Sequence, residues 1–356
     1  MELEQLGWSA FFQQQTIDSP QNLHPARISR QDLGNYHLVA EAGELTGVLP
    51  GRFHHESAAR AELPTVGDWV LVELLTEEPG KAVIREVLER RSKFSRKEAW
   101  QRTEEQIVAA NIDTVFIVSS LDHDFNTERL NRYLVLGWDS GATPVIVLSK
   151  ADICTDVEDK LDQLHAVAMG ASIHVISALT NDGMEALSGY LVSGQTVALM
   201  GSSGVGKSTI INTLAGEQLL DTGEVRDDDS KGRHTTTYRQ LVCLERGGVL
   251  IDTPGMRELQ LWADESTLAE SFDDIESVAS ECRFSDCLHQ DEPGCAVSDA
   301  ISSGGLEQER LDSYRKLQRE LTWLAEKQDV VAQSARKQER KRFGRMMKKR
   351  PTKRDY

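Results

Sequence analysis

A chain of 356 residues is too long for one small core, and 39% hydrophobic residues with a formal net charge of −17 exclude a disordered or membrane-embedded chain. No apolar run approaches the roughly 18 residues of a membrane span, and the acidic start MELEQLGWSAFF lacks the basic region and apolar core of a signal peptide. Five cysteines, three of them within residues 282–295, argue against a secreted disulfide framework, so we expect a cytoplasmic protein.

Basic residues are concentrated in two parts of an otherwise acidic chain. Residues 336–356 hold eleven Lys or Arg against Glu339 and Asp355, and residues 81–102 hold eight basic residues against three acidic ones. An acidic body with basic arms favours contact with nucleic acid at chosen places. The alternative for the tail is a solvated end without a partner.

Short β-type runs occupy residues 25–90, and several are separated by Gly or Pro turns: ARIS, YHLVA, LTGVL, DWVLVEL and KAVIREVL. Five short strands without long helices predict a small barrel of the OB type, a fold that commonly binds oligonucleotides, with an SH3-like module as the alternative. From residue 112 strands alternate with helices, and the strands read TVFIVSS, TPVIVLS, SIHVISA, TVALMG, LVCLE and GVLIDT. That rhythm predicts a parallel α/β sheet.

LSKAD, at the end of the second of these α/β strands, has the pattern that reads a guanine base. Asp152 is predicted to accept hydrogen bonds from guanine N1–H and the exocyclic amine, which adenine does not offer in that arrangement. Lys150 would lay its stem along the base, and Ser149, in place of a more usual asparagine, would make fewer bonds. In the next strand, VISAL supplies Ser177 and Ala178 as a small loop for guanine O6. Each match alone is weak, because helix starts also favour Ser and Asp.

GSSGVGKST follows the apolar strand TVALM and fits the phosphate-loop pattern G-x-x-x-x-G-K-[ST]. Its backbone N–H groups would surround the phosphates. Lys207 would reach the β and γ phosphates as a catalytic residue, and the Ser208 hydroxyl would hold Mg²⁺. A glycine-rich structural turn is the alternative. The predicted nucleotide-binding residues here are Gly201, Ser202, Ser203, Gly204, Val205, Gly206, Lys207, Ser208 and Thr209.

Two further segments complete a nucleotide site. GVLIDTPGM places Asp252 at a strand end, where it would hold Mg²⁺ through water, and Gly255 where its backbone would contact the γ-phosphate. The segment KGRHTTTYRQL lies between the phosphate loop and GVLIDTPGM. Its Thr236 would complete the Mg²⁺ coordination shell as a switch residue. The alternatives are a Pro-Gly turn and a β-prone threonine run.

Along the chain, the two base-reading segments come first, the phosphate loop follows, and the two switch segments come last. An ordinary GTP-binding domain begins with the phosphate loop. A sheet permits the change, since chain ends lie at the surface and can be moved if the old ends are joined. We therefore predict a circularly permuted P-loop GTPase domain. The segment after DTPG would then lead into the C-terminal region, so that loss of the γ-phosphate could be transmitted there.

ECRFSDCLHQDEPGC holds three thiols and one imidazole within fourteen residues. A set of four such ligands with none to spare predicts one structural Zn²⁺ in tetrahedral coordination. Reduced cysteines in a loop are the alternative, and Cys154 and Cys243 are expected to be buried thiols. The predicted zinc ligands are Cys282, Cys287, His289 and Cys295. Leucines and a tyrosine spaced along one helix face follow from residue 311, as expected of core packing.

The barrel, the permuted G domain and this zinc spacing, together with EEQIVAANIDTVFIVSS, KGRHTTT and DTPGMRE, resemble the bacterial ribosome small-subunit-dependent GTPase A family over most of residues 34–300. The resemblance implies a GTP hydrolase, stimulated by the 30S subunit late in its assembly, that contacts 16S rRNA through the barrel, zinc module and tail. We expect a monomer without a membrane partner. The expected divisions are an N-terminal arm (1–33), an OB-like barrel (34–102), the G domain (103–261), a helical zinc domain (262–335) and a basic tail (336–356).

The residue after DTPG is Met256, whose thioether cannot orient an attacking water as a glutamine does. His234, just before the switch threonines, is the candidate for that catalytic role, a choice that similarity to the family favours. Its alternative role is a phosphate or RNA contact, and a ribosomal group could act instead. Two other functions stay open at this point: a small-molecule P-loop kinase, and an RNA-binding regulator that holds GTP without hydrolysing it.

Overall fold

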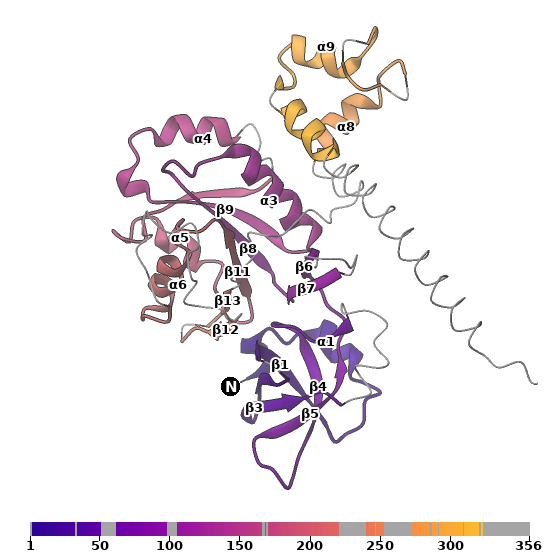
Figure 1. Cartoon of the computed structure of the whole chain (residues 1–356), viewed down its shortest axis with the longest axis vertical. Helices are drawn as coiled ribbons and strands as arrows, with labels where there is room; N and C mark the ends of the chain where they lie inside the picture. Colours follow the sequence, from indigo (N-terminus) through magenta and orange to yellow (C-terminus); the bar gives the residue numbers. More distant parts are fainter. Residues whose placement is uncertain are drawn as a thin grey trace, which may run out of the picture.

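A barrel, a sheet with helices on both faces and a small helical module follow one another along the chain in the computed structural model (Figure 1). The structure describes residues 2–32, 34–50, 62–97, 105–165, 168, 170–220, 240–245, 247–252, 272–284, 287–290, 292–308, 310–319 and 322.

The N-terminal part is a closed five-stranded barrel preceded by two short helices. Strand β1 pairs with both β2 and β4, while β3 pairs with β5 and β5 with β4, so the ring closes in the order of an OB fold. The predicted OB-like barrel is confirmed, but it begins ahead of residue 34, because β1 belongs to it. The elements are η1 Leu3–Leu6, α1 Ala10–Gln15, β1 Leu23–Gln31, β2 Tyr36–Ala40, β3 Gly43–Val48, β4 Trp69–Leu74 and β5 Lys81–Val87.

An antiparallel pair, β6 Lys93–Lys97 and β7 Glu105–Ala110, connects the barrel to the next sheet. That sheet has the order β10-β9-β8-β11-β13-β12, in which the first five strands are parallel. Its strands are β8 Thr114–Ser120, β9 Thr143–Ser149, β10 Ser172–Val175, β11 Thr196–Gly201, β12 Gln240–Cys243 and β13 Val249–Asp252. The first three helical elements between them are α3 Thr127–Asp139, η3 Ala151–Ile153 and α4 Val157–His165, followed by α5 Met184–Ser188 and α6 Lys207–Ala215.

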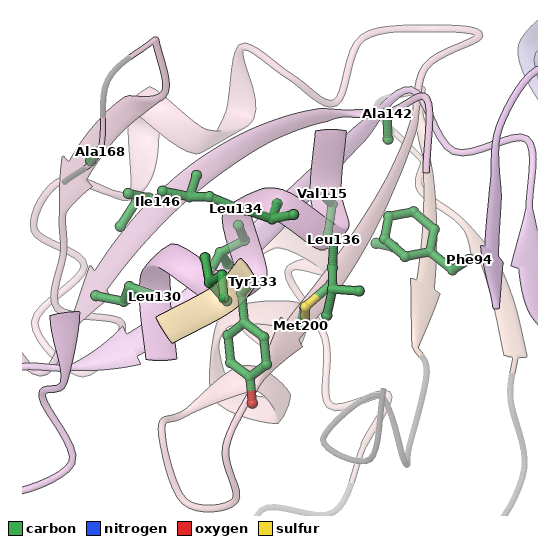
Figure 2. Packing of buried hydrophobic residues seen from close by; sticks show 14 of the residues in the cluster. Phe94, Val115, Leu130, Tyr133, Leu134, Leu136, Ala142, Ile146, Ala168 and Met200 are labelled. Carbon is green, nitrogen blue, oxygen red and sulfur yellow. The ribbon is translucent and has the colours of Figure 1, made fainter. Parts of the chain in front are cut away.

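The sheet is covered on both faces, which explains its uninterrupted apolar strands: every residue of β8 is buried. On one face Val115, Ile146 and Met200 pack with Leu130 and Leu134 of α3, as Figure 2 shows. On the other face alternate residues of the same strands pack with Met184, Leu187, Ile210 and Ile211 of α5 and α6.

All six predicted strands form, but β12 runs antiparallel to β13 and not parallel as expected. The connection from β12 to β13 is too short for a crossover, so the chain turns back as a hairpin. At the far side, β12 meets β1 through the pair Arg30↔Gln240. The barrel and the α/β sheet are therefore one continuous sheet of eleven strands.

The C-terminal module lies at the opposite end of the molecule from the barrel (Figure 1). It contains α8 Asp273–Ala279, α9 Ala296–Ser302 and a helical stretch at 310–319. Leu311, Tyr314 and Leu317 are buried, as their spacing predicts. Lys316 pairs with Glu128 of α3, which ties the module to the sheet domain. Leu321, Leu324 and the basic tail lie outside the described residues.

Candidate nucleotide site and metal centre

The predicted nucleotide-binding segments meet at one edge of the parallel sheet. LSKAD follows β9, VISAL follows β10, the phosphate loop follows β11 and Asp252 ends β13. Because these strands are parallel, their carboxyl ends lie side by side, where open α/β sheets bind ligands. Strand β8 lies between β9 and β11, so its own carboxyl end faces the space between base and phosphates.

The phosphate loop, residues 201–208, curls from β11 into α6. Gly201 has φ 152°, and a Cβ there would lie 2.2 Å from the carbonyl oxygen of Val118 on β8, so a side chain is excluded. Lys207 Nζ donates hydrogen bonds to the carbonyl oxygens of Gly201, at 2.8 Å, and of Ser202, at 2.5 Å. The lysine thus lies folded over the loop in which phosphates would sit.

The two base-reading segments are joined by a hydrogen bond. Ser177 Oγ donates to Asp152 Oδ1 at 2.6 Å, and Ala151 N–H donates to the carbonyl oxygen of Ile176. Ser177 is buried, whereas Asp152 is exposed. The structure brings Asp152, Ser177 and Ala178 together at the sheet edge, and the hydroxyl of Ser177 fixes the direction of the carboxylate.

Ser149 does not face the base. Its side chain is buried, and its hydroxyl donates to the carbonyl oxygen of Val205 in the phosphate loop at 2.6 Å. The serine therefore ties the base segment to the phosphate loop, a role that was not predicted, because the partners are far apart in the sequence.

Two further residues at the site were missed by sequence reasoning. Asp122, just after β8, accepts a hydrogen bond from Lys150 Nζ at 2.9 Å. Tyr133 of α3 makes a side-chain hydrogen bond with Ser202, and its ring is buried in the core while its hydroxyl points away from the other labelled side chains (Figure 2). The sequence contains no motif around Asp122 or Tyr133, and neither residue lies at a characteristic distance along the chain from the phosphate loop.

Asp252 ends β13 near Lys207. Burial raises the pKa of this carboxyl above its ordinary value, and the positive charge of Lys207 opposes the rise. A partly buried carboxylate at the phosphate loop is suited to a divalent cation, which would compensate its charge. Ser208, in the first turn of α6, offers the hydroxyl expected for the same ion. Thr236, His234, Gly255 and Met256 lie outside the described residues.

The four predicted zinc ligands meet in the C-terminal module, where their ligand atoms all lie within 4.8 Å of one another. His289 Nδ1 is 3.7 Å from Cys282 Sγ and 3.5 Å from Cys295 Sγ, and the two sulfurs are 4.0 Å apart. Metal–sulfur bonds of about 2.3 Å and metal–nitrogen bonds of about 2.0 Å require S···S near 3.8 Å and S···N near 3.5 Å in a tetrahedron. The geometry fits a closed tetrahedral metal site.

Comparison with known proteins places the chain in a family. The family model described as RsgA GTPase matches residues 87–262. A model described as ABC transporter matches residues 184–349, a range that also contains the phosphate loop. No helix in the described part of the chain is long and apolar enough to cross a membrane.

Full-length relatives agree with the first match. The chain is 46% identical over 341 residues to "Small ribosomal subunit biogenesis GTPase RsgA" of Opitutus terrae, covering 93% of each chain. It is 48% identical over 321 residues to "Small ribosomal subunit biogenesis GTPase RsgA 2" of Vibrio parahaemolyticus, covering 89% of this chain and 85% of that one.

Solved structures show the same arrangement. YjeQ from Thermotoga maritima has 27% identity and a TM-score of 0.64, with 84% of this chain and 99% of that one covered. YloQ, titled a circularly permuted GTPase, has 25% identity and a TM-score of 0.61, with 86% and 97% covered. The predicted permutation and family are confirmed, and the chain belongs to the RsgA GTPase family.

Proposed function

We propose that this protein hydrolyses GTP to GDP and phosphate and acts in biogenesis of the small ribosomal subunit. The observation that carries the proposal is the position of the base-reading segment beside the phosphate loop at one sheet edge. Ser177 holds the Asp152 carboxylate, and Ser149, in the same segment as Asp152, donates a hydrogen bond to the Val205 carbonyl oxygen of the phosphate loop. The relatives that cover most of the chain are named as GTPases of small-subunit biogenesis. None of these names supports a small-molecule kinase or a regulator that does not hydrolyse GTP.

In the proposed mechanism, Asp152 binds the guanine edge and the N–H groups of residues 201–208 bind the phosphates. Magnesium bound with GTP would neutralise phosphate charge. Ser208 and Thr236 would hold this ion directly and Asp252 through water. Lys207 swings from the loop carbonyls to the β and γ phosphates, because phosphate oxygens are stronger acceptors for an ammonium than carbonyl oxygens.

For the hydrolytic water, His234 is the proposed orienting residue, because Met256 offers only a weak thioether acceptor at the position where glutamine often serves. Gly255 would contact the γ-phosphate through its backbone and move when that phosphate leaves. The permuted order leads the chain from this point into the C-terminal module.

The proposed metal in the C-terminal module is one structural Zn²⁺. Cys282, Cys287, Cys295 and His289 fill four tetrahedral positions, which leaves no position for a substrate. Burial would raise the pKa of the Cys295 thiol, but hydrogen bonds from Ser298 and His289 lower it to about 6, whereas burial raises the pKa of the neighbouring Cys287 thiol to about 11. A stabilised thiolate is the form that binds the metal.

The proposed partner is the 30S subunit, with 16S rRNA contacted by the barrel, the zinc module and the basic tail, in the cytoplasm and as a monomer. The eleven Lys or Arg of residues 336–356 would supply the phosphate contacts that the acidic body does not.

GTP hydrolysis by the purified protein tests the proposal, measured alone, with 30S subunits and with 50S subunits as the control. We expect strong stimulation by 30S subunits only. Equal rates in the three reactions would contradict the small-subunit role, and absence of hydrolysis in all three would contradict the GTPase itself.

A further inference from the structure

We propose that Asp122 is a positioning residue that holds Lys150 across the mouth of the guanine site and so sets the affinity for guanine nucleotides. This inference deepens the proposed function and depends on it. Asp122 belongs to none of the motifs by which the site was recognised.

Asp122 is fixed by donors on both of its oxygens. Oδ1 accepts hydrogen bonds from Ser120 Oγ at 2.7 Å and from the N–H of Asp124 at 2.9 Å, while Oδ2 accepts from Lys150 Nζ at 2.9 Å. Only 15% of the Asp122 side chain is exposed. Burial would raise its pKa, but Lys150 and the other donors hold the pKa well below the usual range. The carboxylate is thus a charged anchor with one orientation.

Lys150 is held at both ends. Its backbone has φ 60°, in the left-handed region that residues with a Cβ rarely adopt, so this conformation needs support from its surroundings. Two residues later Asp152 is fixed by Ser177. The other end, Nζ, is fixed on the loop after β8. The Lys150 side chain is 35% exposed, so part of its aliphatic stem stays open to a ligand.

The strand order places this stem where a nucleoside must pass. β8 lies between β9, which carries the base segment, and β11, which carries the phosphate loop. A lysine that begins after β9 and ends on the loop after β8 therefore points from the base-reading carboxylate toward the phosphates. A guanine base bound at Asp152, with its phosphates on residues 201–208, would lie against that stem.

An anchor of this kind reduces the entropy lost on binding. A free lysine side chain loses rotamer freedom when a ligand packs on it, and prior fixing removes that loss from the binding step. The base is the same in GTP and GDP, so the gain should be equal for both. Hydrolysis at saturating GTP should not depend on it.

A double-mutant cycle tests the proposal, with Asp122→Asn, Lys150→Met and the double variant, each titrated with GTP and with GDP. Asp122→Asn should weaken both nucleotides about five- to tenfold and leave kcat at saturating GTP unchanged. In the Lys150→Met background the same change should alter affinity less than twofold, because Asp122 acts through the lysine. Asp124→Asn is the matched control, since Asp124 lies in the same loop as Asp122 but pairs with Arg129 of α3, and it should change affinity less than twofold.

Two outcomes overturn the inference. An equal loss of affinity from Asp122→Asn in the wild-type and Lys150→Met proteins would show that Asp122 supports the structure of its loop and does not act through Lys150. Tighter binding by Asp122→Asn would mean that the ion pair competes with the base. If the wild-type protein itself bound neither GTP nor GDP, the proposed function would fail, which is a result distinct from both.

Discussion

Arg27 of the barrel donates a hydrogen bond to Thr196 Oγ1, at the start of the phosphate-loop strand, at 2.8 Å. The arginine is 1% exposed, and it also donates to the carbonyl oxygens of Leu6, Gly67 and Asn111. No carboxylate among the described residues accepts a hydrogen bond from it. Burial lowers the pKa of Arg27 to about 10, and the nearby charge of Asp113 opposes the decrease. One side chain therefore joins the N-terminal helix, the barrel, the connecting segment and the sheet domain.

Arg27→Met should destabilise the protein by about 3–5 kcal/mol, because it leaves several buried acceptors without a donor. Chemical unfolding followed by tryptophan fluorescence measures the change, since Trp69 packs beside Arg27. Arg85→Met is the control. It breaks the partly exposed ion pair with Glu73 and should cost less than about 1 kcal/mol. Equal stability of the two variants would contradict the role of Arg27.

Ser149→Ala should weaken GTP and GDP about five- to thirtyfold, the equivalent of about 1–2 kcal/mol for a lost hydrogen bond between the base segment and the phosphate loop. Ser119→Ala is a close control, because the equally buried Ser119 Oγ has no hydrogen-bond partner within the described residues. That change should leave affinity unaltered. Calorimetric titration of both variants with GTP and GDP measures the effect. Identical affinities in the two variants would show that the Ser149–Val205 hydrogen bond does not contribute to nucleotide binding.

Asp252→Asn should stabilise the nucleotide-free protein by about 0.5–2 kcal/mol while it lowers hydrolysis at least tenfold. Burial raises the folded-state pKa of Asp252, so its contribution to stability is present below the ordinary pKa and is lost as the pH rises through the folded-state value. The ionised form of this carboxylate is therefore less favourable in the empty fold than in the unfolded chain. Thermal unfolding without magnesium checks this.

The control for that change is Asp113→Asn. Asp113 accepts hydrogen bonds from Thr196 N–H at 2.8 Å and from Arg91 at 2.7 Å, so its loss should lower the unfolding temperature. A fall in the unfolding temperature for Asp252→Asn as well would show that the carboxylate stabilises the empty site.

If the proposed site holds one zinc, Cys282→Ser should reduce bound zinc to well below one atom per chain and expose the C-terminal module to protease, because a module this small is expected to need its metal for folding. Cys154→Ser should keep one zinc, since Cys154 lies near Asp156 and Lys160 in another part of the fold. Metal analysis of dialysed protein gives the ratio. Equal zinc content in both variants would rule out the proposed ligand set.

His234→Ala should retain GTP binding and lose most of the 30S-stimulated hydrolysis, because the proposed orienting group for water is removed. His165→Ala, an exposed histidine at the end of α4, is the control and should behave as wild type. Single-turnover hydrolysis with 30S subunits separates the step from binding. Unchanged turnover in His234→Ala would exclude this residue from the mechanism.

The sequence predicts those parts of the site in which chemistry and chain order coincide. Asp152 and the glycines of residues 201–208 stand at the ends of apolar strands, and parallel strands must bring their ends together. No motif identifies Asp122 or Tyr133. Asp122 contacts the base-reading segment and Tyr133 contacts the phosphate loop, and each of these segments lies beside its partner only because of the strand order in the sheet. Ser149 was predicted at the base for the same reason: its contact with Val205 depends on three-dimensional packing.

The junction between barrel and sheet shows the same limit. Arginine is rarely fully buried, so Arg27 is expected at the surface from its residue type alone. Arg27 is buried because the barrel packs against the sheet domain at this position, and the local sequence around Arg27 does not predict that contact. The direction of β12 was predictable in principle, because the five residues between β12 and β13 are too few for a parallel crossover.

The strand pairing of Arg30 with Gln240 joins positions 210 residues apart in the sequence, and this separation affects how the nascent chain folds. During synthesis the barrel emerges first, with β1 already paired to β2 and, over residues 23–27, to β4, so only the end of β1 around Arg30 waits for β12. A contact of such long range is slow to form, and an unpaired strand edge invites association with other chains. We expect a barrel-only truncation to associate with other chains only through this end of β1, and the intact protein to acquire nucleotide-binding competence only after residue 252 has been made.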